Sequence, residues 1–137
     1  MKRVIFVGIH NKPDMLPLDV QTKAGKMVTS IVKLIELGEY KAFRTNLCDV
    51  EQMPEAHMIR YYKNDWLIRI APNKDDIIVL LGGWVHFHFP ADKVESHIIK
   101  LPHPSAIRSS TENEKYRYRA AVNIKAAILE KNILFLK

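Results

Sequence analysis

The chain has 137 residues, of which 47% are hydrophobic and 26% charged, a composition typical of one folded domain and not of a disordered chain. The formal net charge of +6 favours a polyanionic partner such as nucleic acid. The single cysteine, Cys48, excludes an internal disulfide and a cysteine-ligated iron–sulfur cluster, and it fits a reducing cytoplasm. No apolar run approaches the roughly 20 residues that cross a bilayer, so we expect no membrane partner.

Apolar runs and helical periodicity alternate along the chain. Short runs rich in Val, Ile and Leu predict strands at residues 2–8, 42–47, 75–81 and 97–101. Periodic patterns predict helices at residues 22–37, 55–71 and 111–132, with a short helix or turn at residues 82–89.

Two of the predicted helices have recognisable ends. Thr22 would cap the first, and Thr111 with Glu114 would form a capping box for the last. The outer face of the last helix would be basic, and its inner face apolar. The outer residues are Lys115, Arg117, Arg119 and Lys125, and the inner residues are Ala120, Ala121, Ile124, Ala127 and Ile128.

This alternation predicts a single α/β domain, in which helices cover both faces of a four-stranded, mainly parallel sheet to give three α/β/α layers. The carboxyl ends of parallel strands meet at one edge, where open α/β sheets bind ligands. We therefore expect three segments to gather there: the loop after Gly8, the segment at Asn46 and the loop at His103.

The sequence of residues 101–108 is more typical of a functional loop than of a simple connection between a strand and a helix. Pro102 and Pro104 flank His103, so the backbone around this imidazole has little freedom. Ile107 is apolar in a loop that should be polar, and Arg108 adds a fixed charge. The alternative is a plain strand-to-helix turn with a chance histidine.

Several segments together resemble the uracil-DNA glycosylase superfamily, and their order and spacing cover nearly the whole chain. The most specific is the His-Pro-Ser sequence at residues 103–105. The others are Val7-Gly8-Ile9 with the proline-containing loop after it, residues 22–27, Thr45-Asn46-Leu47 and Leu80-Leu81-Gly82. The chain lacks the cysteines of the iron–sulfur branch, so the resemblance is to a compact branch without a cluster.

The resemblance implies cleavage of the N-glycosidic bond of uracil, or of a related deaminated base, after the base has left the DNA stack. His103 matches the family histidine that donates a hydrogen bond to the base as negative charge develops. Asn46 matches the asparagine that reads the base edge, with a turn or cap role as its alternative. Gly8, Ile9 and Leu18 would line the base site, Leu18 in place of a stacking aromatic. The implied reaction needs no cofactor and no metal.

The resemblance also implies contacts with DNA. Ile107 stands where the family keeps an aliphatic wedge that fills the space left by the flipped base, although packing onto the last helix would also explain it. Arg108, Lys23 and Lys26 would hold phosphates, with Ser105 beside them. A solvated basic face is the alternative for these charges.

The first motif departs from the family pattern. Members that cleave efficiently carry Asp or Glu just after the glycine, where this chain has Ile9. An alignment with the asparagine-containing branch puts His10, or Asn11 after a shift of one residue, at the position that holds water. Asp14 or Asp19 would be substitutes for the missing acid.

Other motifs give weaker signals. His86 and His88 would share one face, but no third metal ligand follows at a suitable spacing. Trp84, Phe87 and Phe89 are expected to pack in the core or against a helix rather than form a stacking platform.

We therefore expect a monomeric, cytoplasmic DNA-repair enzyme that acts on DNA containing uracil or another deaminated base. One rival is a catalytically weak member that only binds nucleic acid or a nucleobase-like ligand, which Ile9 at the acid position would explain. The other is an unrelated α/β hydrolase or nucleotide-binding protein whose loops mimic these motifs.

Overall fold

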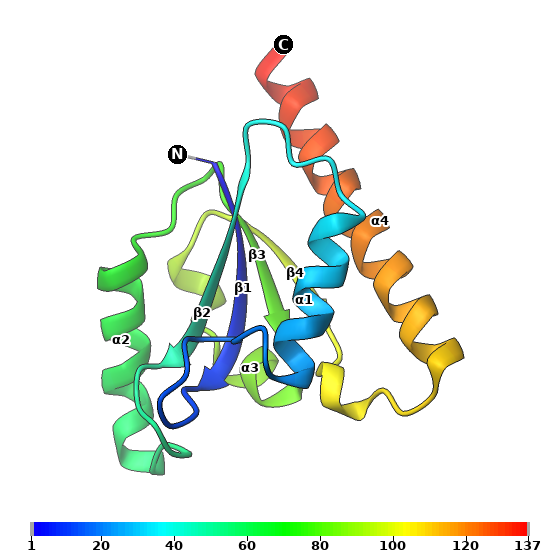
Figure 1. The fold of residues 1–137 in the computed structure, drawn as a ribbon. Coiled ribbons are helices and arrows are strands. Elements are labelled where there is room, and N and C mark those ends of the chain that lie inside the picture. The colour runs from blue at the N-terminus through cyan, green and yellow to red at the C-terminus, as the bar shows by residue number, and fades with distance from the viewer. Residues whose placement is uncertain (1, 137) are drawn as a thin grey trace.

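The computed structural model describes residues 2–136, and side chains as far as residue 132. Its four strands form one parallel sheet in the order β2-β1-β3-β4, so the predicted α/β fold is confirmed and the sheet is parallel throughout (Figure 1). The strands are β1 (Arg3–His10), β2 (Lys41–Cys48), β3 (Ile77–Leu81) and β4 (His97–Leu101).

Helices cover both faces of the sheet, which gives the three predicted layers (Figure 1). One face packs against α1 (Lys23–Lys33) and α4 (Ser110–Leu136), and the other against α2 (Ile59–Ile70) and α3 (Gly83–His88). Short 3-10 turns are η1 (Ala56–Met58), η2 (Ala91–Lys93) and η3 (Pro104–Ala106). Among residues 2–136, none of the helices has the length and apolarity to cross a bilayer.

The core follows from the two-residue period of the strands. Val4 and Phe6 of β1 face the α1/α4 layer, whereas Ile5 and Val7 face the α2/α3 layer. All five residues of β3 are buried, as expected for a central strand covered on both sides. The predicted inner face of the last helix is buried as well.

Two predicted boundaries were wrong in ways that affect the candidate site. β1 continues two residues beyond Gly8 because its pairing with β2 extends to His10 opposite Cys48, so Ile9 and His10 belong to the strand. α1 ends at Lys33, four residues early, because the Leu34 N–H turns back to the Ile31 carbonyl at 3.0 Å.

The predicted capping box of the last helix was also wrong. α4 begins at Ser110, and its N-terminal contact is the Glu112 N–H donating to the Ser109 hydroxyl at 3.1 Å. Thr111 and Glu114 therefore lie inside the helix. On its outer face Arg117 is half-buried, whereas the other predicted basic residues are exposed.

Candidate functional site

The strand order creates a crevice at the carboxyl edge of the sheet. The chain passes from β1 outward to β2, then returns to the other side of β1 to form β3 and β4. Connections therefore leave β1 and β3 in opposite directions, and ligands of open α/β sheets bind outside such a point.

A pocket of about 180 Å³ opens at this edge. It is smaller than the roughly 300 Å³ at which pockets for drug-sized ligands begin, so it suits a ligand with a single ring. The pocket brings together predicted site residues from four separate segments of the chain. They are Gly8, Ile9 and His10 of β1, Leu18 and Lys23, Asn46 of β2, and His103 with Ser105.

His103 is held in one tautomer by Ser105. The Ser105 backbone N–H, which can only donate, points at His103 Nδ1 at 3.1 Å, and the Ser105 hydroxyl lies 2.6 Å from the same atom. Nδ1 is therefore an acceptor, and the proton of the neutral ring is on Nε2. Burial, and then the nearby Lys12 ammonium, lower the pKa of His103 below its usual 6.5. At neutral pH the site thus holds an uncharged imidazole with a free Nε2–H donor.

The His103 loop approaches β3 closely because the chain has a glycine there. Gly82 has φ of +95° and accepts no side chain without strain. A Cβ on Gly82 would lie 3.0 Å from His103 Cβ. The Gly82 N–H also donates to the Leu101 carbonyl at 2.8 Å, which ties the end of β3 to the start of the loop.

Asn46 is oriented by two successive side-chain hydrogen bonds, which run from Asp49 through Asn11. Asp49 can only accept, so it takes a hydrogen bond from Asn11 Nδ2 at 2.8 Å. This turns Asn11 Oδ1 toward Asn46 Nδ2, which donates to it at 2.8 Å. Asn46 is 5% exposed, and Gly8 leaves room for it, because a Cβ there would lie 2.4 Å from Asn46 Oδ1.

His10 has the opposite tautomer to His103. Its Nδ1 lies 2.9 Å from the Asn11 carbonyl, which only accepts, so Nδ1 carries the proton and the neutral ring keeps Nε2 as an acceptor. The pocket is therefore lined by one imidazole that offers a donor and one that offers an acceptor.

The wall opposite the strands is the segment before α1. Leu18 lies in the left-handed region with φ of +50°, and Arg44 holds its carbonyl at 2.7 Å. Arg44 also donates to the Gly25 carbonyl at 3.0 Å and to the Thr29 hydroxyl at 2.7 Å. Gly25 lets α1 touch this segment, since a Cβ would lie 1.8 Å from the Asp19 carbonyl oxygen.

Asp19 is the one carboxylate among the described residues that line the pocket. Its carboxylate accepts the Gln21 N–H at 2.9 Å and the Leu16 N–H at 3.3 Å. Asp14, the other substitute suggested for the missing acid, is exposed and does not line the pocket.

Four predicted site residues lie outside the pocket. Asn11 stands behind Asn46 as its hydrogen-bond partner. Ile107 is half-buried and packs against the core, and its carbonyl accepts a bond from Lys23 Nζ at 2.6 Å. Arg108 is exposed, and its backbone N–H faces Glu112 at 3.4 Å. Lys26 is exposed on the next turn of α1.

Sequence reasoning missed Lys12, Asp49 and Arg44. Lys12 lines the pocket beside His103, and the other two position Asn46 and Leu18 through hydrogen bonds. Nothing in the strand sequence singles out Arg44, because β2 also contains Lys41, Thr45 and Asn46. Nothing local signals Asp49, because its partner lies 38 positions away.

The weaker motifs have structural explanations. His86 Nε2 lies 3.1 Å from the Leu80 carbonyl and 2.9 Å from the Leu101 carbonyl, so this ring joins β3 to β4. Within residues 2–136, no three His, Cys, Asp or Glu side chains are grouped to hold a metal. Burial raises the pKa of Cys48 to about 11, which keeps it a thiol.

The aromatic residues of α3 only partly match their predicted place in the core. Phe89 is buried and Trp84 is half-buried, but Phe87 is 83% exposed. Phe87 is therefore not in the core, because α3 is a single short helix with only one side against the sheet, and its ring contacts His88 of the same helix edge-on.

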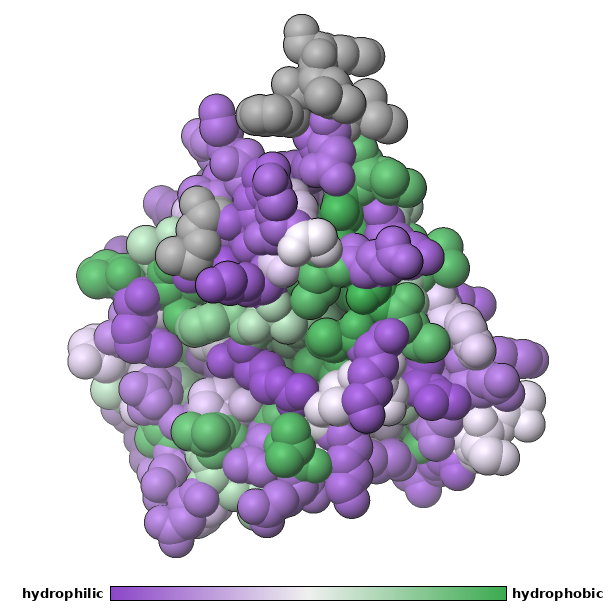
Figure 2. All heavy atoms as spheres, turned by 45° about the horizontal axis from the view of Figure 1, so that its top comes forward, coloured by the Kyte–Doolittle hydropathy of each residue, from purple (hydrophilic) through white to green (hydrophobic). Residues whose placement is uncertain are grey.

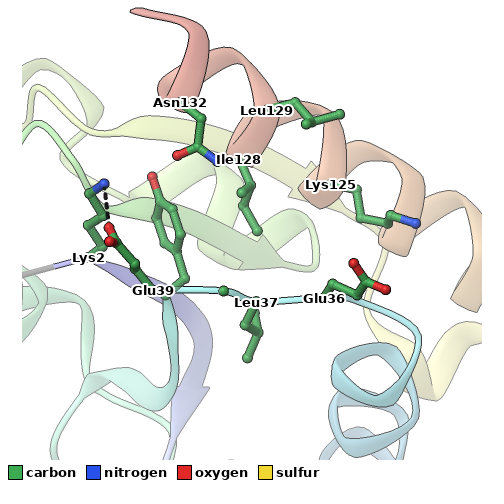
Figure 3. Close-up of a pocket in the computed structure, with 10 residues that line it drawn as sticks. Lys2, Glu36, Leu37, Glu39, Lys125, Ile128, Leu129 and Asn132 are labelled. Atoms are coloured by element: carbon green, nitrogen blue, oxygen red, sulfur yellow. Dashed lines mark hydrogen bonds and ion pairs between the residues drawn. The ribbon is translucent and has the colours of Figure 1, made fainter. Parts of the chain in front are cut away.

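A larger hollow, of about 550 Å³, lies at the opposite edge, near the amino ends of β1 and β2. Apolar side chains gather beside α4 on this face (Figure 2). In the close-up, Lys2 and Glu39 point toward one another at 3.0 Å, Leu37 comes from the loop between α1 and β2, and Ile128 comes from α4 (Figure 3). The polar residues that line this hollow are Lys2, Glu36, Glu39, Tyr40, Lys125 and Asn132, and none of the predicted site residues is among them.

The fold and pocket together define a doubly wound α/β protein whose sheet has, at its carboxyl edge, a single-ring-sized site lined by apolar and hydrogen-bonding residues. Comparisons with models of protein families, with curated proteins and with solved structures found no match.

Proposed function

We propose that the protein removes uracil, or a related deaminated base, from DNA by hydrolysis of the N-glycosidic bond. The observation that carries this proposal is that His103 and Asn46, from distant segments, line one pocket of about 180 Å³. A neutral imidazole and a carboxamide provide the hydrogen-bonding groups that a planar base with carbonyl and N–H edges requires.

His103 would stabilise the leaving base. When the bond between the base and the sugar breaks, the bonding electrons stay with the base, and negative charge builds on its carbonyl oxygen. The Nε2–H of His103 is a fixed donor for that oxygen, since Nδ1 is occupied by Ser105. Removal of such a donor typically costs about 10²–10³ in rate.

Asn46 would select the base. Its Nδ2 is directed by Asn11, so its Oδ1 and second amide hydrogen are available to read a donor and an acceptor on the base edge. A base with a different pattern of donors and acceptors would leave a nearly buried amide unpaired, which is costly.

His10 and Asp19 would serve the sugar side of the reaction. His10 Nε2 can accept a proton from the water that attacks the sugar carbon, and the Asp19 carboxylate can balance the positive charge of the oxocarbenium ion. These two groups would do the work of the acid that Ile9 replaces. The products are the free base and an abasic sugar.

The test is an assay of a uracil-containing oligonucleotide for strand breakage after alkali. The proposal expects breakage with the parent protein and a loss of breakage with His103→Ala and Asn46→Ala. His57→Ala is a matched control, because its ring is exposed and lies outside the pocket. No breakage with the parent protein, over long incubation with single- and double-stranded substrates, would refute the enzymatic proposal.

The second candidate is a protein that binds a nucleobase or nucleic acid without cleaving it. Ile9 at the family's acid position favours it, because an aliphatic side chain neither orients water nor stabilises a cation. Binding of uracil-containing DNA that His103→Ala weakens, without breakage after alkali, would support this candidate.

A further inference from the structure

A basic groove of about 470 Å³ lies between α1 and the first turns of α4. These helices pack against each other on one side of the sheet (Figure 1). The groove is lined by Lys23, Lys26, Met27 and Ser30 of α1 and by Ser110, Asn113 and Arg117 of α4. None of the described residues that line it is acidic, so its charge is uniformly positive.

Two polar atoms of residues that line this groove are shielded from solvent and have no hydrogen-bond partner among the described residues. They are Arg117 Nε, which can only donate, and Asn113 Oδ1, which accepts. A buried polar group without a partner costs about 1–3 kcal/mol, and more if it is charged. A ligand that accepts from a guanidinium and carries a donor, such as a hydrated or protonated phosphate, would satisfy both atoms.

The groove adjoins the base pocket. Lys23 lines both of them, and its Nζ lies 2.6 Å from the Ile107 carbonyl at their border. A ligand whose ring fills the pocket would thus extend its charged part past Lys23 toward Arg117. A nucleotide has this arrangement of a neutral ring and an anionic phosphate.

From these observations we infer that the groove between α1 and α4 binds a phosphate of the nucleotide whose base enters the pocket. Arg117 is its main ligand, and Lys26 its second. This inference rests on the proposed function for the position of the base, but not for the binding of phosphate. The phosphate belongs either to a nucleic-acid strand or to a free nucleotide, which the same chemistry would hold.

The test compares binding of four probes by Arg117→Gln, Lys26→Gln and the parent protein. The probes are inorganic phosphate, deoxyuridine, deoxyuridine monophosphate and a short single-stranded oligonucleotide. Arg119→Gln is the matched control, since it removes the same charge from an exposed position two residues along α4 and outside the groove.

The inference expects Arg117→Gln and Lys26→Gln each to weaken binding of the phosphate-bearing probes about tenfold, with binding of deoxyuridine unchanged. Each should also reduce the slope of log affinity against log salt concentration for the oligonucleotide by about one, whereas Arg119→Gln should leave this slope unchanged. Weakening with the mononucleotide identifies a nucleotide ligand, and weakening with the oligonucleotide alone identifies a strand. Lys26 is exposed, so Lys26→Gln should fold normally and still test phosphate binding even if Arg117→Gln fails to fold.

The nuclear magnetic resonance signal of the Arg117 Nε–H gives a direct readout of the groove. It should shift when inorganic phosphate or deoxyuridine monophosphate is added. Equal affinities of the Arg117→Gln and Arg119→Gln variants for every probe, or an unmoved Nε–H signal, would overturn the inference. Uracil release by the parent protein is measured separately, so Arg117-dependent phosphate binding without release refutes the proposed function alone.

Discussion

Ser105 points two groups at a single atom of His103: its backbone N–H at 3.1 Å and its hydroxyl at 2.6 Å from Nδ1. Both residues belong to the Pro-flanked loop that follows β4, and Pro104 between them is buried. The arrangement keeps Nδ1 unprotonated and leaves the proton of the neutral ring on Nε2. The chemistry proposed for the site depends on this one proton position.

Loss of the His103 ring should therefore reduce base release more than it reduces stability. We expect His103→Ala to lower the rate by about 10²–10³, the cost of removing one preorganised donor. Because the side chain is only half-buried, the melting temperature should change little. Single-turnover release of uracil and thermal unfolding measure the two effects, and a rate within twofold of the parent would contradict the assignment of the donor.

The pH dependence should follow the lowered pKa of His103. Burial and Lys12 keep the folded protein's ring neutral at a pH where the unfolded chain takes up a proton. Below about pH 6.5 the unfolded state therefore binds more protons, and this residue's contribution to stability falls as the pH falls. Protonation of His103 should therefore cause no change in the rate of base release above pH 6.5.

A titration of the His103 ring by nuclear magnetic resonance measures this shift directly. Lys12→Gln should raise the pKa of His103, but only in part, because burial is the larger cause and remains. A parent value above 6.5, or no response to Lys12→Gln, would contradict this explanation.

Gly8 should be intolerant of any side chain because of Asn46. An added Cβ would lie 2.4 Å from Asn46 Oδ1, so Gly8→Ala must displace the amide or shift the strand, at a cost of about 1–3 kcal/mol. Gly83→Ala is the matched control, since a Cβ there meets no atom within 4 Å. Chemical denaturation gives the stabilities, and equal effects of the two substitutions would contradict the close contact.

Arg44 should stabilise the pocket wall although it lies outside the pocket. Arg44→Met removes the donors to the Leu18 carbonyl, the Gly25 carbonyl and the Thr29 hydroxyl, and we expect a loss of about 1.5–3 kcal/mol in the free energy of unfolding. The same substitution at Arg69 removes an exposed pair with Asp65 and should cost at most about 1 kcal/mol. Comparable losses at both positions would show that the Arg44 contacts contribute nothing special.

The sequence was sufficient for the fold because the pattern of the strands is local. Five consecutive apolar residues in β3, and the period of Ala120, Ile124 and Ile128 in α4, identify their elements without tertiary information. The ends of strands were harder to predict, because they depend on hydrogen bonding to a neighbouring strand. The extension of β1 to His10 depends on Cys48 of β2, which no pattern near His10 reveals.

Only those residues of the candidate site that belong to a recognisable sequence motif could be predicted. His103, Asn46 and Gly8 could be named from the sequence, and they line one pocket. Arg44 and Asp49 could not be named, since the bonds of Arg44 to Leu18 and of Asn11 to Asp49 span 26 and 38 positions. Arg117 was predicted on an exposed basic face, but the packing of α4 against α1 shields its Nε.

If His103 and Asn46 bind the same planar ring, a titration with free uracil followed by nuclear magnetic resonance will show it. We expect the His103 Nε2–H and the Asn46 side-chain amide signals to shift together, with one affinity, and Asn46→Ala to abolish the shift at His103. Signals that stay unmoved at saturating uracil, or that titrate with separate affinities, would contradict it.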